Sequence, residues 1–159
     1  MSSVRVEGAD EIASLFRRSG GIFDRVARGW LRDQSIDAVN TVQRNTLNVG
    51  AVDTNELIQG THYDISRDSD GVQSVIGFSD KANEYAVYVE EGTRPHFPPL
   101  DAIRPWADRH GIPAFLVARK IAREGTDPRY FMRDSFVEVQ RDVDRNLDRL
   151  LDQIMQGFE

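Results

Sequence analysis

The sequence predicts an α+β fold in which a small antiparallel β-sheet packs against a long N-terminal helix and a C-terminal helix, with short helices between them. Apolar residues recur at helical spacing over residues 22–47 and again over residues 129–158. Two runs rich in β-branched and aromatic residues, 61–67 and 72–79, flank Asp70-Gly71, which is typical of a hairpin turn because glycine tolerates positive φ. Two helices and one hairpin therefore define the predicted fold class.

The size and composition of the chain favour a single folded domain over residues 1–159. Its 159 residues suit one domain, and 40% apolar residues can build a core of ordinary size. Cysteine is absent, which excludes disulfides and cysteine metal sites. The first residues show no apolar leader segment, and no run is long and apolar enough for a membrane span. We therefore expect the protein to be made in a cytoplasm and to have no membrane partner.

The C-terminal segment carries the most regular apolar pattern in the chain. Successive apolar residues are separated by 3, 4, 4, 3, 4 and 4 positions, which keeps them on one face of a helix. This predicted stripe consists of Phe136, Val139, Val143, Leu147, Leu150, Ile154 and Phe158. It is expected to pack on the rest of the fold, or to dock its last turns on another subunit.

Shorter elements are expected between the hairpin and the last helix. The predicted short helices span residues 83–91, 100–110 and 114–123. In the second of them, Ile103 and Trp106 are expected to point inward. Before the hairpin, Asp53 or Thr54 is expected to cap a short turn that brings Leu57 and Ile58 to the core.

Charge is distributed unevenly along the chain. Residues 53–91 carry nine acids and two bases, whereas residues 94–133 carry eight bases and four acids. The formal net charge of −6 argues against nucleic-acid binding by the whole surface. The two segments are either solvated faces, or an acidic surface of one subunit that meets a basic surface of its neighbour. A small nucleic-acid-binding module that uses residues 94–133 is the alternative function.

No arrangement of residues predicts catalysis. The three histidines, His62, His96 and His110, lack the i, i+4 spacing of a helical zinc site. Glu90 and Glu91 are adjacent, so on a helix they diverge by about 100° and do not form an acid–base pair. The sequence has no glycine-rich phosphate loop. We therefore predict no catalytic, cofactor or metal site, and a protein that is not an enzyme.

Residues 85–96, YAVYVEEGTRPH, form the most distinctive stretch of the chain. They resemble the "YAxYVExGT" signature of a head–tail joining family of long-tailed bacteriophages. Residues 130–136 are similar to the later "PFLRPAL" motif of that family, with Asp134 in place of its second proline. Residues 53–57 are similar to its "DTGxL" turn, with Asn55 in place of glycine, and asparagine also tolerates positive φ. The resemblance extends from about residue 22 to residue 136.

This resemblance implies a structural virion protein at the head–tail junction. Such a neck or tail-completion protein would form a ring from copies of itself and help to join the tail to the DNA-filled head. Its other partners would be the head connector and the tail-tube or other neck proteins. DNA would pass through the ring without sequence-specific binding.

Two groups of residues are candidates for contacts in such a ring. The candidate interface residues are Tyr85, Tyr88, Glu90, Glu91, Gly92, Thr93, Arg94 and Pro95. The candidate basic residues for a channel or for inter-subunit pairs are Arg104, Arg119, Lys120 and Arg123. Prolines 95, 98 and 99 stiffen the loop after Thr93, which either docks on a partner at low entropic cost or simply links two core helices.

Overall fold

The computed structural model describes residues 21–51, 53–68 and 71–156 and confirms the predicted α+β fold class. Its helices and strands follow one another as α2 (Gly21–Asn48), α3 (Glu56–Gly60), β1 (Thr61–Asp68), β2 (Gly71–Phe78), α4 (Asp80–Glu91), α5 (Leu100–Arg109), α6 (Ala114–Glu124) and α7 (Phe131–Gln156). The predicted turn residue Asp70 lies outside the described residues, although the strands end and begin on either side of it.

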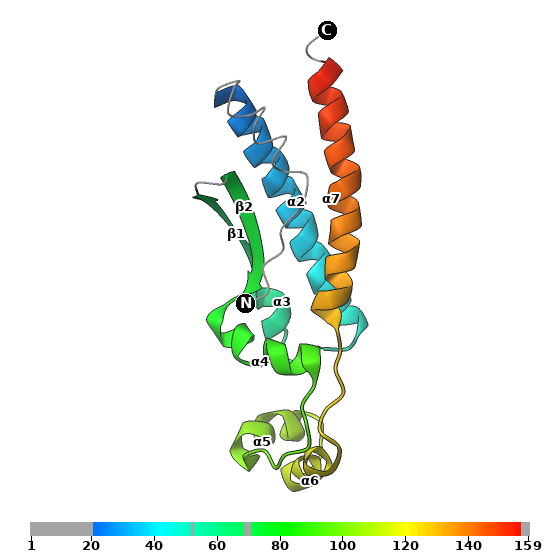
Figure 1. Cartoon of the computed structure of the whole chain (residues 1–159). Helices are drawn as coiled ribbons and strands as arrows, with labels where there is room; N and C mark the ends of the chain where they lie inside the picture. The colour runs from blue at the N-terminus through cyan, green and yellow to red at the C-terminus, as the bar shows by residue number, and fades with distance from the viewer. Residues whose placement is uncertain (1–20, 52, 69–70, 157–159) are drawn as a thin grey trace.

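The elements form two parts of unequal size (Figure 1). In the larger part, which we call the body, α2 and α7 lie side by side, and the β1–β2 hairpin lies along α2 with α3 and α4 at its base. The smaller part, which we call the arm, consists of α5 and α6. Two extended linkers, residues 92–99 and 125–130, connect the arm to the body.

Helix α2 is the central element of the body, and its buried positions are small or hydroxyl-bearing. The hydroxyl of Thr46 donates to the carbonyl of Val42 at 2.7 Å, and that of Ser35 donates to the carbonyl of Leu31 at 2.7 Å. Such a bond back to the preceding turn satisfies the buried hydroxyl of Thr46 within its own helix, whereas the hydroxyl of Ser35 also lies 2.6 Å from that of Ser74 on β2. Such short side chains allow both the hairpin and α7 to approach the same helix closely.

The main apolar core lies where α2, α3, α4 and α7 meet. Its buried members are Val42, Leu57, Ala82, Ala86 and Phe131. The hairpin reaches this core through Ile76 and Phe78 of β2, and the rings of Phe78 and Phe131 meet edge to face with centroids 6.0 Å apart. One aromatic contact thus links the sheet to the beginning of the C-terminal helix.

Three expectations about side chains require correction. Phe136 was expected in the buried stripe of the C-terminal helix, but it is 41% exposed, because α7 turns Phe131 and Ser135 toward α2. Of the same stripe, Leu150 is buried, whereas Phe158 lies outside the described residues. Trp106 was expected to point inward, yet it is 37% exposed and stacks on the ring of His110.

The third correction concerns the start of α3. The residue before this helix is Asn55, which adopts φ 61° and makes no side-chain capping hydrogen bond. The expected caps Asp53 and Thr54 therefore do not serve that role, although Leu57 reaches the core as predicted. Asn55 has the positive φ that was expected at this position of the turn, and asparagine tolerates this conformation better than most residues other than glycine.

Replacing Phe131 by alanine should destabilise the body far more than the same change at Phe136. Phe131 is fully buried, and its loss leaves a cavity at the junction of four helices, at a cost of about 3–5 kcal/mol. Phe136 lies in the same helix but is partly exposed, so F136A should cost less than about 1 kcal/mol. Urea unfolding of both variants measures the two free energies; equal losses would contradict this assignment of the core.

Candidate functional site

The two linkers between body and arm are joined by a short antiparallel bridge. The backbone N–H of Thr93 donates to the carbonyl of Thr126, and the N–H of Thr126 donates to the carbonyl of Thr93, both at 3.1 Å. The two threonine hydroxyls also lie 3.1 Å apart. We call Gly92, Thr93, Gly125 and Thr126 the joint, because the polypeptide runs from the body to the arm and back through these residues.

Both glycines of the joint are required by its geometry. Gly92 has φ 68°, and a Cβ at this position would lie 2.2 Å from the carbonyl oxygen of Thr126. Gly125 has φ 76°, and its Cβ would lie 2.0 Å from the carbonyl oxygen of Thr93. The two linkers therefore approach too closely for any side chain at either position. The repeated Gly-Thr pair at residues 92–93 and 125–126 was a sequence signal for this pairing, but sequence reasoning missed its second half.

Glu90 holds the first turn of α7. Its carboxylate accepts hydrogen bonds from the backbone N–H groups of Met132 at 2.8 Å and Arg133 at 2.9 Å. Its own carbonyl accepts from the N–H groups of Arg129 and Tyr130. The first N–H groups of a helix have no partner within the helix, and a carboxylate there also interacts favourably with the helix dipole. The structure thus gives this candidate interface residue a contact within its own chain.

The two candidate tyrosines of α4 lie in different environments. Tyr85 packs against the main core, where burial raises the pKa of its hydroxyl, and the nearby Glu56 carboxylate raises it further. Tyr88 is 61% exposed, and Glu91 beside it is exposed as well. Among the candidates on α4, Tyr88 and Glu91 are therefore the most exposed to a partner, whereas Tyr85 and Glu90 are half-buried.

The arm is held together by small residues and leaves its larger apolar residues open. Ala107 of α5 and Ala118 of α6 are fully buried where the two helices meet. In the linker before α5, Pro98 is buried, whereas Arg94 and Pro95 are exposed. The exposed large apolar residues of the arm and its linker are Phe97, Trp106, Ile112, Phe115 and Leu116. Such a concentration in one small part is typical of an interaction surface.

A polar contact fastens the arm to the body. Arg109, at the end of α5, donates through Nε to the carboxylate of Asp53 at 3.1 Å, and the two side chains form an ion pair. The hydrogen bond from Arg109 lowers the pKa of Asp53 below its usual range, and the charges of Arg109 and His110 act in the same direction. Asp53, which was expected to cap a helix, instead orients the arm.

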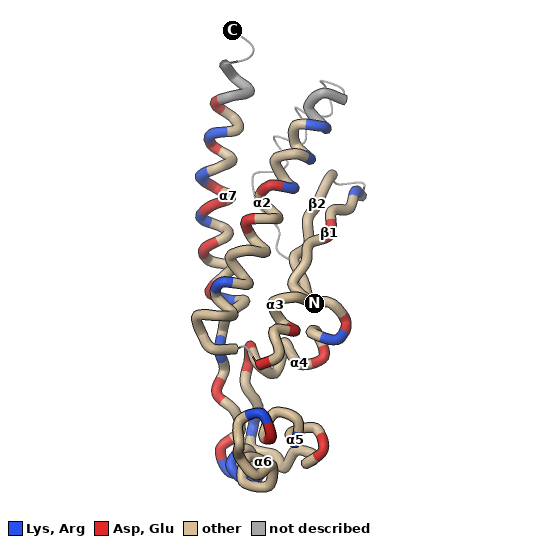
Figure 2. The backbone as a smooth tube through the Cα atoms, turned by 180° about the vertical axis from the view of Figure 1, so that it is seen from behind, with Lys and Arg blue, Asp and Glu red and all other residues tan. Residues whose placement is uncertain are grey.

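The candidate basic residues divide into paired and unpaired groups. Arg104 forms an ion pair with Asp101, and Arg123 pairs with the adjacent Glu124. Arg119 and Lys120 are exposed and form no ion pair within the described part of the chain. Figure 2 shows basic positions along α6 and acidic positions around α3 and α4. The acidic segment 53–91 and the basic segment 94–133 of the sequence thus occupy different regions of the molecule.

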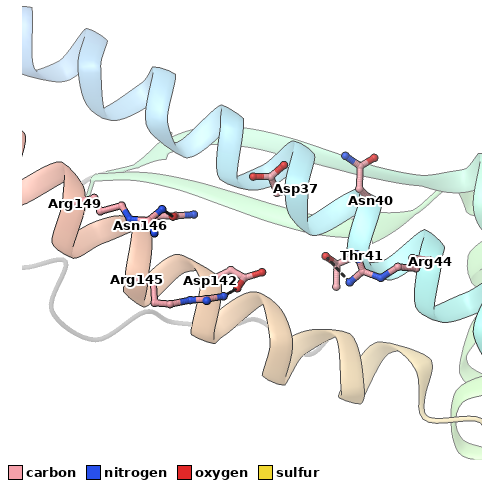
Figure 3. A pocket seen from close by; sticks show the side chains of 8 residues that line it. All are labelled: Asp37, Asn40, Thr41, Arg44, Asp142, Arg145, Asn146 and Arg149. Atoms are coloured by element: carbon pink, nitrogen blue, oxygen red, sulfur yellow. Dashed lines mark hydrogen bonds and ion pairs between the residues drawn. The ribbon is translucent and has the colours of Figure 1, made fainter.

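A shallow polar groove of about 350 Å³ lies between α2 and α7 (Figure 3). Several of its charged side chains form ion pairs. Within the groove, Arg145 pairs with Asp142. Arg44, at its edge, pairs with Glu138 of α7 at 2.6 Å. Since both charges are present and mostly paired, the groove does not offer a concentrated charge to a ligand.

Comparisons with known proteins identify no relative. No family model, no curated protein and no solved structure matches the chain. Among the described helices, none is long and apolar enough to cross a membrane. Among the residues that the structure describes, no three side chains of histidine, aspartate or glutamate lie close enough together to hold a metal ion. The candidate site is therefore the joint together with the arm that it carries.

Replacing Gly125 by alanine should weaken the joint strongly, and Gly111 provides the matched control. Both glycines have positive φ, but a Cβ at Gly111 would meet nothing within 4 Å. G111A should therefore cost about 1–2 kcal/mol for the left-handed backbone alone. G125A should cost at least about 2 kcal/mol more, because the linkers must separate. Urea unfolding measures both values; equal costs would show that the close approach of the linkers does not matter.

The pKa of Asp53 should depend on Arg109. Because this pKa is lowered in the folded protein, the ion pair contributes stability above the unfolded pKa of about 3.9, and that contribution is lost as pH falls through the lower folded value. In R109Q the pKa should return toward the usual range. An NMR titration of the Asp53 carboxyl group measures the shift, and an unchanged midpoint would disprove the contact.

Proposed function

We propose that this chain is a structural subunit of a long-tailed bacteriophage particle, and that copies of it form a ring at the head–tail junction. In this role it would act as a neck or tail-completion protein and help to join the tail to the DNA-filled head. It would reside in the virion after synthesis in the host cytoplasm. Its neighbours would be further copies of the chain, the head connector, and tail-tube or other neck proteins.

The observation that carries this proposal is the position of the family-like residues. Glu90, Gly92 and Thr93 belong to the stretch that resembles the head–tail joining signature, and all three lie at or beside the joint. The joint holds a protruding arm whose large apolar residues remain exposed in the isolated chain. A subunit that completes its buried surface only by assembly needs such a projection.

The unpaired bases of α6 fit contacts between subunits or a channel for DNA. Arg119 and Lys120 form no ion pair with a described residue, although the charge of Lys120 acts on Glu124, whereas Arg104 and Arg123 have partners within their own helices. This internal pairing leaves few free bases in residues 94–133 and disfavours the alternative of a nucleic-acid-binding module. Non-specific DNA binding of useful strength requires several phosphate contacts at once.

Light scattering and negative-stain microscopy of the purified chain, alone and mixed with particle extracts, test this proposal. We expect closed rings, or monomers that join tails or filled heads, because the exposed arm needs a partner. A monomer that ignores particles but binds duplex DNA in low salt would contradict the ring and favour the nucleic-acid module. Reversing the charges of Arg119, Lys120 and Arg123 should impair joining; unchanged joining would exclude these bases from it.

A further inference from the structure

The outer face of α4 combines exposed apolar residues with acids. Val87 and Tyr88 are 58% and 61% exposed, although the opposite face of the same helix is buried in the core. At 100° per residue, Glu84 and Glu91 share the face of Val87 and Tyr88. Both glutamates are exposed, and neither forms an ion pair within the residues that the structure describes. This face is thus an apolar pair flanked by two unpaired negative charges.

The outer face of α6 also combines two exposed apolar residues with two charged residues, but here the charges are positive. Phe115 and Leu116 are 54% and 43% exposed, although the ring of Phe115 also lies 6.5 Å from that of Phe97 between centroids. Leu116 lies on the side of the helix opposite Ala118, which is fully buried. Arg119 follows Phe115 by one helical turn, and Lys120 follows Leu116 by one turn, so both bases lie on the exposed face. This face is an apolar pair flanked by two positive charges that form no ion pair with a described residue, although Lys120 also interacts with the carboxylate of Glu124.

We propose that α6 of one copy of this chain docks on α4 of the next copy. The apolar pairs would meet at the centre of this contact, and Arg119 and Lys120 would face Glu84 and Glu91. This inference rests on the proposed ring and adds the pair of surfaces that build it. Because the two faces differ, the contact is heterologous: an open assembly keeps one free α4 face at one end and one free α6 face at the other until a ring closes.

A second copy fits these surfaces better than DNA does. Phosphates could neutralise Arg119 and Lys120, but DNA would leave the acidic face of α4 uncovered and would offer the apolar pair on α6 no matching surface. A second copy covers both faces with one kind of contact, and opposite charges around an apolar centre determine which partner binds and in which register. Among the residues that the structure describes, none buries Tyr88, and Phe115 stays 54% exposed beside the ring of Phe97.

Site-directed cross-linking tests the contact directly, since the chain contains no cysteine of its own. V87C and L116C place one thiol on each face, and one of the two variants carries a mass tag. Mixed in low salt with a short bis-maleimide, they should form a tagged-to-untagged dimer. V75C is the matched control on β2, because Val75 is similarly exposed but lies on neither face. V75C mixed with L116C should give only background dimer.

Charge reversal adds a rescue experiment. Introducing R119E and K120E into L116C should lower the yield of cross-linked dimer by about tenfold or more, because like charges would then face each other. Introducing E84K and E91K into V87C should restore the yield when these two variants are mixed. Restoration would also exclude misfolding as the cause of the loss.

The outcomes separate this contact from the proposed function. A V87C–L116C dimer with rescue supports the contact even if no closed ring is seen. Rings without this cross-link leave the proposed function in place and overturn the contact. A V87C dimer with itself would assign α4 to a symmetric interface and overturn the proposal. DNA binding that depends on Arg119 and Lys120, with no cross-link between copies, would assign α6 to nucleic acid and overturn it as well.

Discussion

The reciprocal hydrogen bonds between Thr93 and Thr126 are the constraint on which the arrangement of the molecule depends. They close a loop of the chain that contains the whole arm, and they require glycine at positions 92 and 125 because the backbones nearly touch there. A bridge of two hydrogen bonds is weak on its own. Here it is supported on the body side by Glu90, which fastens the incoming linker to the first turn of α7.

The body on which this joint rests is unusual in its central helix. Helix α2 contacts two neighbours at once, the hairpin and α7, and several of its contacts with α7 are polar. Asn45 donates to the hydroxyl of Ser135 at 3.0 Å, and Asn146 donates to Gln34 at 2.8 Å. Directional contacts of this kind define one register between two helices more strictly than apolar packing would. Larger apolar residues of both helices, such as Ile36 and Phe136, remain partly exposed.

Much of the fold followed from local patterns in the sequence. The long helix expected over residues 22–47 is α2, and the strands and short helices begin and end within about three residues of their predicted positions. Glycine and proline mark these boundaries because they restrict or widen the accessible φ angles. The candidate site was predicted only in part. Thr93 and Gly92 were recognised from the resemblance, whereas their partners at 125 and 126 were not.

By itself, the sequence determined the secondary structure and the separation of acidic from basic segments. It also determined that Asn55 and Gly92 can adopt positive φ. Each of these properties depends on residues that are close in the chain. Only the tertiary structure decided which face of the last helix is buried, because Phe131 rather than Phe136 meets the core formed by distant elements. It likewise decided that Glu90 binds a helix 42 residues away. Contacts between residues so far apart in the sequence depend on the packing of the whole chain, and the local periodicity of apolar residues does not predict them.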